Sequence, residues 1–193
     1  MVEGACALID CGGIEVREMD GGNIMKTLLA LFSLLIAVLF LPVPAHADFR
    51  IQSIDNDFQS EINAAADEGK RLVIFFHQLG CPYCDKMRAR VHPDPKIMSY
   101  FNDHYVMIES NIKGNLDVVM PDGTPGNEVE FGRAMRVRAT PVFAFYDLDG
   151  TLALKSVGFL DVDRFLLAGK YVVDGVHKTG KSYFNYLQEE QSK

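Results

Sequence analysis

Residues 75–87 read Phe-Phe-His-Gln-Leu-Gly-Cys-Pro-Tyr-Cys-Asp-Lys-Met, and this stretch decides the predicted fold. An apolar run over residues 72–76 leads into a short turn, and two cysteines follow where a helix is expected to begin. The partial positive charge at a helix N-terminus favours a thiolate, so Cys81, in the first turn, is the predicted reactive sulfur. Cys84 lies one turn further along the same face, close enough to form a disulfide with Cys81. Pro82 is tolerated there because the first N–H groups of a helix have no intrahelical partner.

The Cys-x-x-Cys spacing alone leaves two interpretations open, because the same spacing also occurs in zinc sites. The buried-strand pattern before the pair, the helix after it and the Pro-Tyr dipeptide between the cysteines favour redox chemistry. The alternative is a metal-handling protein in which Cys81, Cys84 and either His77 or His92 hold Cu(I) or Zn. Neither histidine has a tight ligand spacing to the pair, so we expect no metal site and no cofactor.

The composition is typical of one globular domain. The chain has 193 residues and is 48% hydrophobic, which is enough to bury a core. Its net charge is −7 and it contains no basic block, so nucleic acid is not an expected partner. We expect a monomer.

An N-terminal export signal is predicted. A basic residue precedes an apolar core at residues 28–41, and Ala-His-Ala at 45–47 matches the Ala-x-Ala pattern of a cleavage site. The apolar core is shorter than the roughly 20 residues that cross a membrane. We therefore expect residues 25–47 to be a signal peptide, cleaved after Ala47, which exports residues 48–193 to the periplasm. An uncleaved membrane anchor is the alternative.

Residues 1–24 fit neither the signal nor the fold. They hold five acidic residues and one arginine, whereas the start of a signal peptide is basic. We expect translation to start at Met25 and residues 1–24 to be a non-native or untranslated extension. Cys6 and Cys11 then lie outside the mature domain, which keeps a single close pair of cysteines. A single disulfide between two neighbouring cysteines cannot cross-link distant parts of an exported domain, so the pair is interpreted as catalytic.

The predicted elements describe an α/β domain. Residues 71–77 contain a continuous apolar run, Leu-Val-Ile-Phe-Phe at 72–76, without alternation, so they are predicted to form a central strand buried on both faces. Residues 114–127 are rich in Gly, Pro and Asp and are predicted to form a hairpin or surface flap. Two parallel units are expected to lead into a C-terminal antiparallel hairpin, with helices on both faces. The predicted helices are 57–70, 82–91, 96–102, 128–135, 161–173 and 182–188 (the last packing through Phe184 and Leu187), and the strands are 71–77, 105–112, 142–146 and 152–158.

Three stretches resemble the thioredoxin superfamily, namely residues 72–76, residues 80–87 (Gly-Cys-Pro-Tyr-Cys-Asp-Lys-Met) and residues 136–141 (Arg-Val-Arg-Ala-Thr-Pro). They are most similar to the SoxW-type periplasmic thioredoxins, and the similarity includes the His-Pro-Asp-Pro break at 92–95. The resemblance covers roughly residues 55–190. It implies a three-layer α/β/α fold whose central mixed sheet has about four to five strands and includes the C-terminal antiparallel hairpin.

The resemblance also implies a thiol–disulfide oxidoreductase, with protein-disulfide reduction as the expected activity. Cys81 is then the attacking thiolate and Cys84 the resolving thiol. Pro141 is expected in cis, facing the cysteines, and the backbone of Thr140 is expected to pair with an extended substrate. The expected substrate-binding residues are Thr140, Pro141, Pro82 and Tyr83.

The sequence departs from the family pattern near the cysteines. Phe75 stands where thioredoxins usually carry a buried aspartate, so proton transfer to and from Cys84 needs another group or water. Glu109, at a strand position usually held by lysine, is the proposed proton relay. Gly80 replaces the usual tryptophan, which changes the surface offered to substrate. His77, when protonated, is expected to add positive charge near the cysteines.

The expected partners are disulfide-containing periplasmic proteins and a membrane thiol reductant of the DsbD or CcdA kind, because an oxidising compartment requires re-reduction of the pair. Reductases, oxidases and isomerases share these residues and differ in reduction potential, so oxidase or isomerase activity stays open. A thioredoxin-fold binding module with incidental thiols is the non-enzymatic alternative.

Overall fold

The computed structural model describes Lys26 and residues 48–192. The chain divides into two units, residues 1–45 and residues 46–193, and the fold belongs to the second. Apart from Lys26, the predicted extension, signal peptide and cleavage site lie outside the described residues. Within the described part of the chain, no helix combines the length and the apolar character needed to cross a bilayer.

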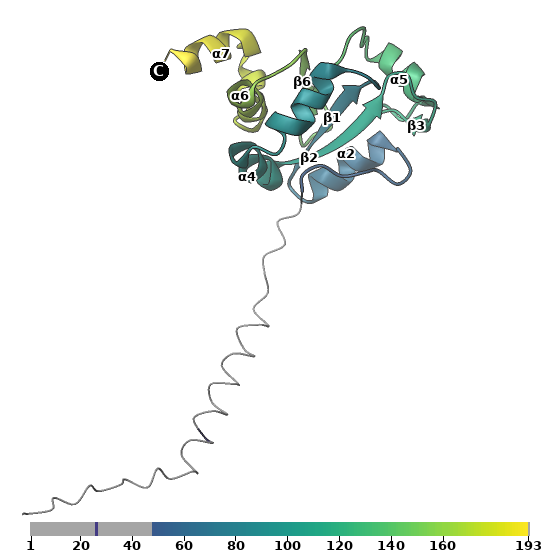
Figure 1. Ribbon diagram of the computed structural model, residues 1–193, viewed down its shortest axis with the longest axis horizontal. Coiled ribbons are helices and arrows are strands. Elements are labelled where there is room, and N and C mark those ends of the chain that lie inside the picture. The colour runs from purple at the N-terminus through teal and green to yellow at the C-terminus, as the bar shows by residue number, and fades with distance from the viewer. Residues whose placement is uncertain (1–25, 27–47, 193) are drawn as a thin grey trace, which may run out of the picture. The chain divides into compact units, whose positions relative to one another are not determined.

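The centre of the second unit is a four-stranded mixed sheet in the order β2-β1-β5-β6 (Figure 1). Strand β1 (Arg71–His77) pairs in parallel with β2 (Tyr105–Asn111) and antiparallel with β5 (Val142–Tyr146). Strand β6 (Leu152–Val157) pairs antiparallel with β5, which confirms the C-terminal hairpin. The predicted central strand is confirmed with its predicted bounds, and its five inner residues, the apolar run, are all buried.

One prediction about strand direction is wrong. The sequence led us to expect two parallel units, but β5 runs antiparallel to β1, so only β1 and β2 form a parallel unit. The segment between β2 and β5 contains a separate small hairpin of β3 (Asp117–Val119) and β4 (Pro125–Asn127), which confirms the predicted flap.

The helices begin where polar side chains can cap them. A side chain of Asp or Asn at the N-cap, or Ser in the last case, accepts a backbone N–H of the first turn in each of five helices, which satisfies groups that the helix itself leaves unpaired. These five helices are α2 (Phe58–Asp67), α4 (Pro95–His104), α5 (Glu128–Ala134), α6 (Val162–Val173) and α7 (Tyr183–Gln191). The other helical segments are α3 (Pro82–Lys86), the π-helical turn η1 (Met87–Val91) and the 3₁₀ turn η2 (Val176–Thr179).

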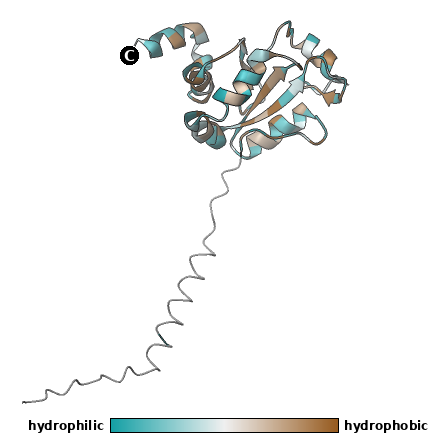
Figure 2. Ribbon diagram, viewed as in Figure 1, coloured by the Kyte–Doolittle hydropathy of each residue, from teal (hydrophilic) through white to brown (hydrophobic). Residues whose placement is uncertain are grey.

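Two apolar clusters give the three-layer arrangement. On one face of the sheet, Val73 and Phe75 of β1 pack with residues of α3, η1, α4, α6 and α7. On the other face, Ile74 and Phe76 pack with residues of α2, α5 and the small hairpin. Figure 2 shows the resulting pattern, with hydrophobic strands between helices that mix hydrophobic and hydrophilic residues. The three-layer fold is confirmed.

The last helix packs differently from the prediction. Phe184 is 65% exposed, whereas Tyr186 is buried against Tyr171 of α6 at a ring-centroid distance of 5.5 Å. Tyr186 is the buried residue because the face of α7 that carries it is the face that packs on α6. The short apolar pattern of this segment did not indicate which face that would be.

A buried carboxylate ties the C-terminal segment to the sheet. Asp147, only 3% exposed, accepts a hydrogen bond from Arg71 Nε at 2.8 Å and forms an ion pair with Lys178, and His177 Nε2 lies 3.3 Å from its carboxylate. Burial alone raises the pKa of Asp147, but hydrogen bonds from Lys178, the Leu148 N–H and Arg71 outweigh it and lower the pKa to about 2.

We expect Asp147→Asn to lower the free energy of unfolding at pH 7 by about 2 to 3 kcal/mol, because Arg71 loses its buried counter-charge. The folded-state pKa lies below the unfolded value of 3.8, so this contribution is present above pH 3.8 and is lost as pH falls through about 2. Urea unfolding measures it. Asp149→Asn, at an exposed position of the same turn, is the control and should change stability by less than about 0.5 kcal/mol; equal losses in both variants would contradict the account.

Candidate active site

The two cysteines lie at the start of α3, the helix that follows β1 in the chain. Gly80 adopts a φ of 71°, a left-handed conformation that suits glycine and turns the chain between β1 and α3. Cys81 is the N-cap of α3 and forms a disulfide with Cys84 of the first turn, with 5.3 Å between their Cα atoms. Cys81 therefore caps the helix, whereas the sequence analysis placed it within the first turn.

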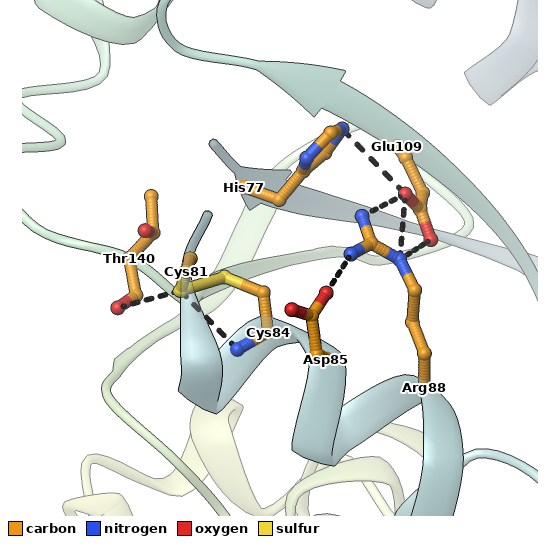
Figure 3. Close-up of a disulfide and its surroundings, with 7 residues drawn as sticks. All are labelled: His77, Cys81, Cys84, Asp85, Arg88, Glu109 and Thr140. Carbon is orange, nitrogen blue, oxygen red and sulfur yellow. Dashed lines mark hydrogen bonds and ion pairs between the residues drawn. A yellow bond between two sulfur atoms is a disulfide. The ribbon is translucent and has the colours of Figure 1, made fainter. Parts of the chain in front are cut away.

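The sulfur of Cys81 has two polar neighbours. The Cys84 N–H donates to Cys81 Sγ at 3.2 Å, and the carbonyl oxygen of Thr140 lies 3.6 Å from the same sulfur (Figure 3). A backbone N–H directed at the sulfur, added to the partial positive charge of the helix start, favours the thiolate once the disulfide is reduced. This arrangement is consistent with Cys81 as the nucleophile, which stays a prediction.

Pro141 is cis, as the resemblance implied, and it directly precedes β5 beside the disulfide. The Thr140 carbonyl faces Cys81, and no hydrogen bond within residues 48–192 occupies the Thr140 N–H. An extended chain approaching the cysteines therefore meets a free backbone donor, which is the feature expected of a substrate-pairing segment.

Access to the two sulfurs is unequal. Cys81 is 4% exposed and Cys84 is fully buried. A reacting thiol or disulfide can thus reach Cys81, while Cys84 is reached only from within the protein. This asymmetry suits an attacking and a resolving sulfur in the predicted roles.

Apolar side chains surround the entrance. Pro82 is exposed, Tyr83 is 58% exposed and Leu79 is 85% exposed. The ring of Tyr83 lies 6.2 Å from that of Phe159, and the ammonium group of Lys86 lies 4.4 Å from the Phe159 ring centroid. A substrate at the disulfide would contact this apolar rim, where the family usually presents tryptophan.

The floor of the site is aromatic. Phe75 is fully buried, belongs to the same cluster as both cysteines and stacks on Phe143 at 4.8 Å. The ring of His92 meets Phe75 edge-on at 5.3 Å, and neither imidazole nitrogen has a hydrogen-bond partner in the described residues. Burial, together with the positive charges of Arg50 and Arg88, lowers the pKa of His92 to about 3, so this histidine is neutral.

A chain of charged groups flanks the disulfide. Arg88 Nε donates to Glu109 Oε1 at 3.0 Å, and Arg88 Nη1 lies 3.4 Å from Asp85 Oδ1. His77 Nε2 lies 3.5 Å from Glu109 Oε2 (Figure 3). The Arg88 guanidinium also lies 5.1 Å from the Phe75 ring centroid, so one side chain covers the aromatic floor and joins the active-site helix to β2.

These contacts change two expectations. Burial lowers the pKa of His77, although the charge of Glu109 acts in the opposite direction, so His77 adds little positive charge at neutral pH. Glu109 is held by Arg88 and His77, and no hydrogen bond or ion pair of the described residues joins it to a cysteine. Sequence analysis missed the role of Arg88, although its i,i+4 spacing from Cys84 placed it on the same helix face.

The geometry also bears on the metal-handling alternative. No cluster of three or more potential metal ligands occurs in the described part of the chain. His77 faces Glu109, and His92 is enclosed by phenylalanine rings. In the part of the chain that the structure describes, the two histidines named in that alternative make other contacts.

Comparisons with known proteins agree with this geometry. A family model described as a thioredoxin-like domain matches residues 58–173. A search of curated protein sequences found no match. Among solved structures, a thioredoxin-fold protein from Helicobacter pylori has a TM-score of 0.53 at 16% identity, covering 76% of this chain and 86% of that chain.

Two further structures are similar in fold. A thioredoxin from Thermus thermophilus has a TM-score of 0.51 at 22% identity, covering 65% of this chain and 90% of its own. A putative disulphide-isomerase from Bacteroides thetaiotaomicron gives 0.51 at 22%, with coverages of 65% and 92%. The family match spans more than half of the chain and includes Cys81, Cys84 and cis-Pro141, so the chain belongs to the thioredoxin-like domain family.

Proposed function

We propose that the protein is a periplasmic thiol–disulfide oxidoreductase that reduces disulfides in other exported proteins, in the manner of SoxW-type thioredoxins. The observation that carries the proposal is the Cys81–Cys84 disulfide at the start of a helix, opposite cis-Pro141. The unequal burial of the two sulfurs and the free Thr140 N–H support it. The predicted signal peptide, residues 25–47, supports the location.

The reaction starts from the reduced pair. The Cys81 thiolate attacks one sulfur of a substrate disulfide, forms a mixed disulfide and releases the other substrate sulfur as a thiolate, which takes up a proton. Cys84 then loses its proton and attacks Cys81 Sγ, which breaks the mixed disulfide and releases the second substrate thiol. The substrate gains two electrons and two protons, and the protein returns to the disulfide form described here.

A donor must restore the dithiol after each turnover. We propose a membrane thiol reductant of the DsbD or CcdA kind, which delivers two electrons to the pair in an oxidising compartment. Oxidase or isomerase activity is the alternative, because the same two sulfurs run the exchange in either direction.

Insulin reduction by dithiothreitol tests the activity. The purified protein is expected to accelerate precipitation of the insulin B chain in a manner that depends on Cys81. Metal analysis of protein purified without chelator tests the metal-handling alternative, and stoichiometric copper or zinc on the pair would favour it over the reductase.

The proposed relay role of Glu109 gives a separate prediction. Phe75 offers no proton acceptor, and Arg88 keeps the Glu109 carboxylate oriented beside the active-site helix. If Glu109 takes the Cys84 proton through water, Glu109→Gln should slow release of the mixed disulfide by roughly tenfold. Stopped-flow measurement of the single-turnover rate against pH provides the readout. An unchanged rate and pH profile in Glu109→Gln, with Asp85→Asn as the control, would exclude the relay.

A further inference from the structure

A cavity opens at the outer edge of β2, away from the cysteines. It has a volume of about 550 Å³, which is within the range of ligand sites. Its walls come from the segment before α2, from the ends of β1 and β2, and from the loop that leads to β3, with Glu128 of α5. Neither cysteine, Thr140 nor Pro141 lines it, although His77 and Glu109 do, so the cavity does not include the two sulfurs.

The backbone of β2 is left open at one position inside this cavity. The Met107 N–H and C=O point away from β1 and pair with Phe49 O and Ile51 N at 2.6 and 2.9 Å. Because strand groups alternate in direction, the N–H and C=O of Glu109 point the same way. No hydrogen bond from residues 48–192 meets these two groups on that side, although the next outward N–H, that of Asn111, is bonded to Glu128 Oε1 at 2.7 Å.

This open position is the size of one β-bridge. Beyond Ile51 the N-terminal segment leaves the sheet, so it pairs with Met107 and not with Glu109. An incoming extended chain of two or three residues can form the missing bridge with Glu109 in the way that residues 49–51 pair with Met107. Ile51, 43% exposed, and Leu116, 58% exposed, offer apolar walls to its side chains.

A negative charge in the cavity, that of Glu128, favours a peptide that carries a positive charge. Glu128 is 7% exposed; its Oε1 accepts from Asn111, and its Oε2 makes no hydrogen bond or ion pair within the described residues. Gly114 leaves room for that oxygen, since a Cβ there would stand 1.8 Å from Glu128 Oε2. Arg50, which also lines the cavity, is already bonded to Asp48 at 2.9 Å, so Glu128 presents the unpaired charge.

We propose that this cavity binds a short extended peptide segment carrying a cationic nitrogen, which bridges to the Glu109 backbone and donates to Glu128 Oε2. The cationic nitrogen is a lysine side chain or a free amino terminus. The site uses neither cysteine, Thr140 nor Pro141. It shares Glu109 with the proposed proton relay, but through the backbone of that residue and not its carboxylate, so the proposed function does not depend on it.

The test uses tripeptides without cysteine and amide-resolved NMR. Acetyl-Val-Lys-Val-amide, acetyl-Val-Gln-Val-amide and Val-Gln-Val-amide with a free amino terminus are titrated into the purified protein, and the Glu109 amide resonance is followed. We expect saturable shifts at Glu109 with both cationic peptides and binding about tenfold weaker with the neutral one. The stronger of the two cationic peptides identifies the source of the nitrogen.

Glu128→Gln keeps an oxygen for the Asn111 N–H and removes the charge. It should weaken binding of the stronger cationic peptide about tenfold and leave the neutral peptide unchanged, whereas Glu68→Gln, at an exposed site away from the cavity, should change neither. The proposal is overturned if no peptide gives a saturable Glu109 shift up to about 5 mM, or if the wild-type protein binds cationic and neutral peptides equally. The second comparison needs no variant, so it stands even if Glu128→Gln fails to fold. Failure of this test leaves insulin reduction unaffected.

Discussion

Replacing Cys81 with serine is expected to lower the rate of insulin reduction by about three orders of magnitude or more, to that of dithiothreitol alone. The serine hydroxyl is a far weaker nucleophile than a thiolate and cannot form the mixed disulfide. The packing of the site should survive, because serine can still accept the Cys84 N–H that the sulfur accepts at 3.2 Å. The lower rate of insulin reduction is therefore expected to come from the missing thiolate and not from a loss of folding. An unchanged thermal unfolding temperature would verify that.

Cys84→Ser is the matched variant at the buried sulfur. It should retain attack by Cys81 but stop at the mixed disulfide, since the resolving thiol is gone. Mass spectrometry after mixing with a disulfide peptide should find the adduct in Cys84→Ser and not in Cys81→Ser. Adduct formation on Cys84 in the Cys81→Ser variant would reverse the assigned roles and contradict the burial argument.

The second large effect concerns stability in acid. His92 is fully buried among Phe49, Phe75 and other phenylalanine rings, and its pKa of about 3 lies far below the value of 6.5 expected in the unfolded chain. The folded state thus holds His92 neutral, while the unfolded state takes up a proton below pH 6.5. Stability is full above pH 6.5 and falls towards pH 3, by about 2.5 kcal/mol between pH 7 and 4.5.

His92→Phe should remove most of this acid loss. The phenyl ring keeps the edge-on contacts and buries no unpaired nitrogen, so the variant should also be more stable than the wild type at pH 7, by about 1 kcal/mol or more. Urea unfolding at pH 7 and 4.5 measures both effects. His104→Gln, at a partly exposed histidine, should retain the wild-type pH dependence. A His92→Phe protein that loses as much stability in acid as the wild type would disprove the assignment.

Much of the fold was predictable because its local signals are strong. The five residues 72–76 are all apolar, which indicates a central strand buried on both faces, and β1 has the predicted bounds of 71–77. The helix starts predicted at residues 161 and 182 coincide with the N-caps Asp161 of α6 and Ser182 of α7. The direction of a strand, in contrast, has no local signal in the sequence. Whether β5 runs with or against β1 depends on how the chain returns after α5, and the apolar pattern of a strand is the same in both directions.

The candidate site divides in the same way. The cysteines and the cis-proline follow from motifs, and the structure places them together as expected. Arg88 and His92 lie on or after the same helix, yet one reaches across to Glu109 and the other turns into the core. The π-helical turn Met87–Val91 rotates the residues that follow it relative to a regular helix. The sequence of this turn contains no pattern that predicts a π-helix.

The equilibrium of the Cys81–Cys84 pair with glutathione tests the reductase proposal most directly. The purified protein is equilibrated in buffers of graded glutathione ratio, and the reduced fraction is counted after alkylation by mass spectrometry. We predict a reduction potential near that of thioredoxin, about −270 mV, which would let the pair donate electrons to protein disulfides. A potential near about −120 mV would contradict the proposal, because such a pair oxidises its partners.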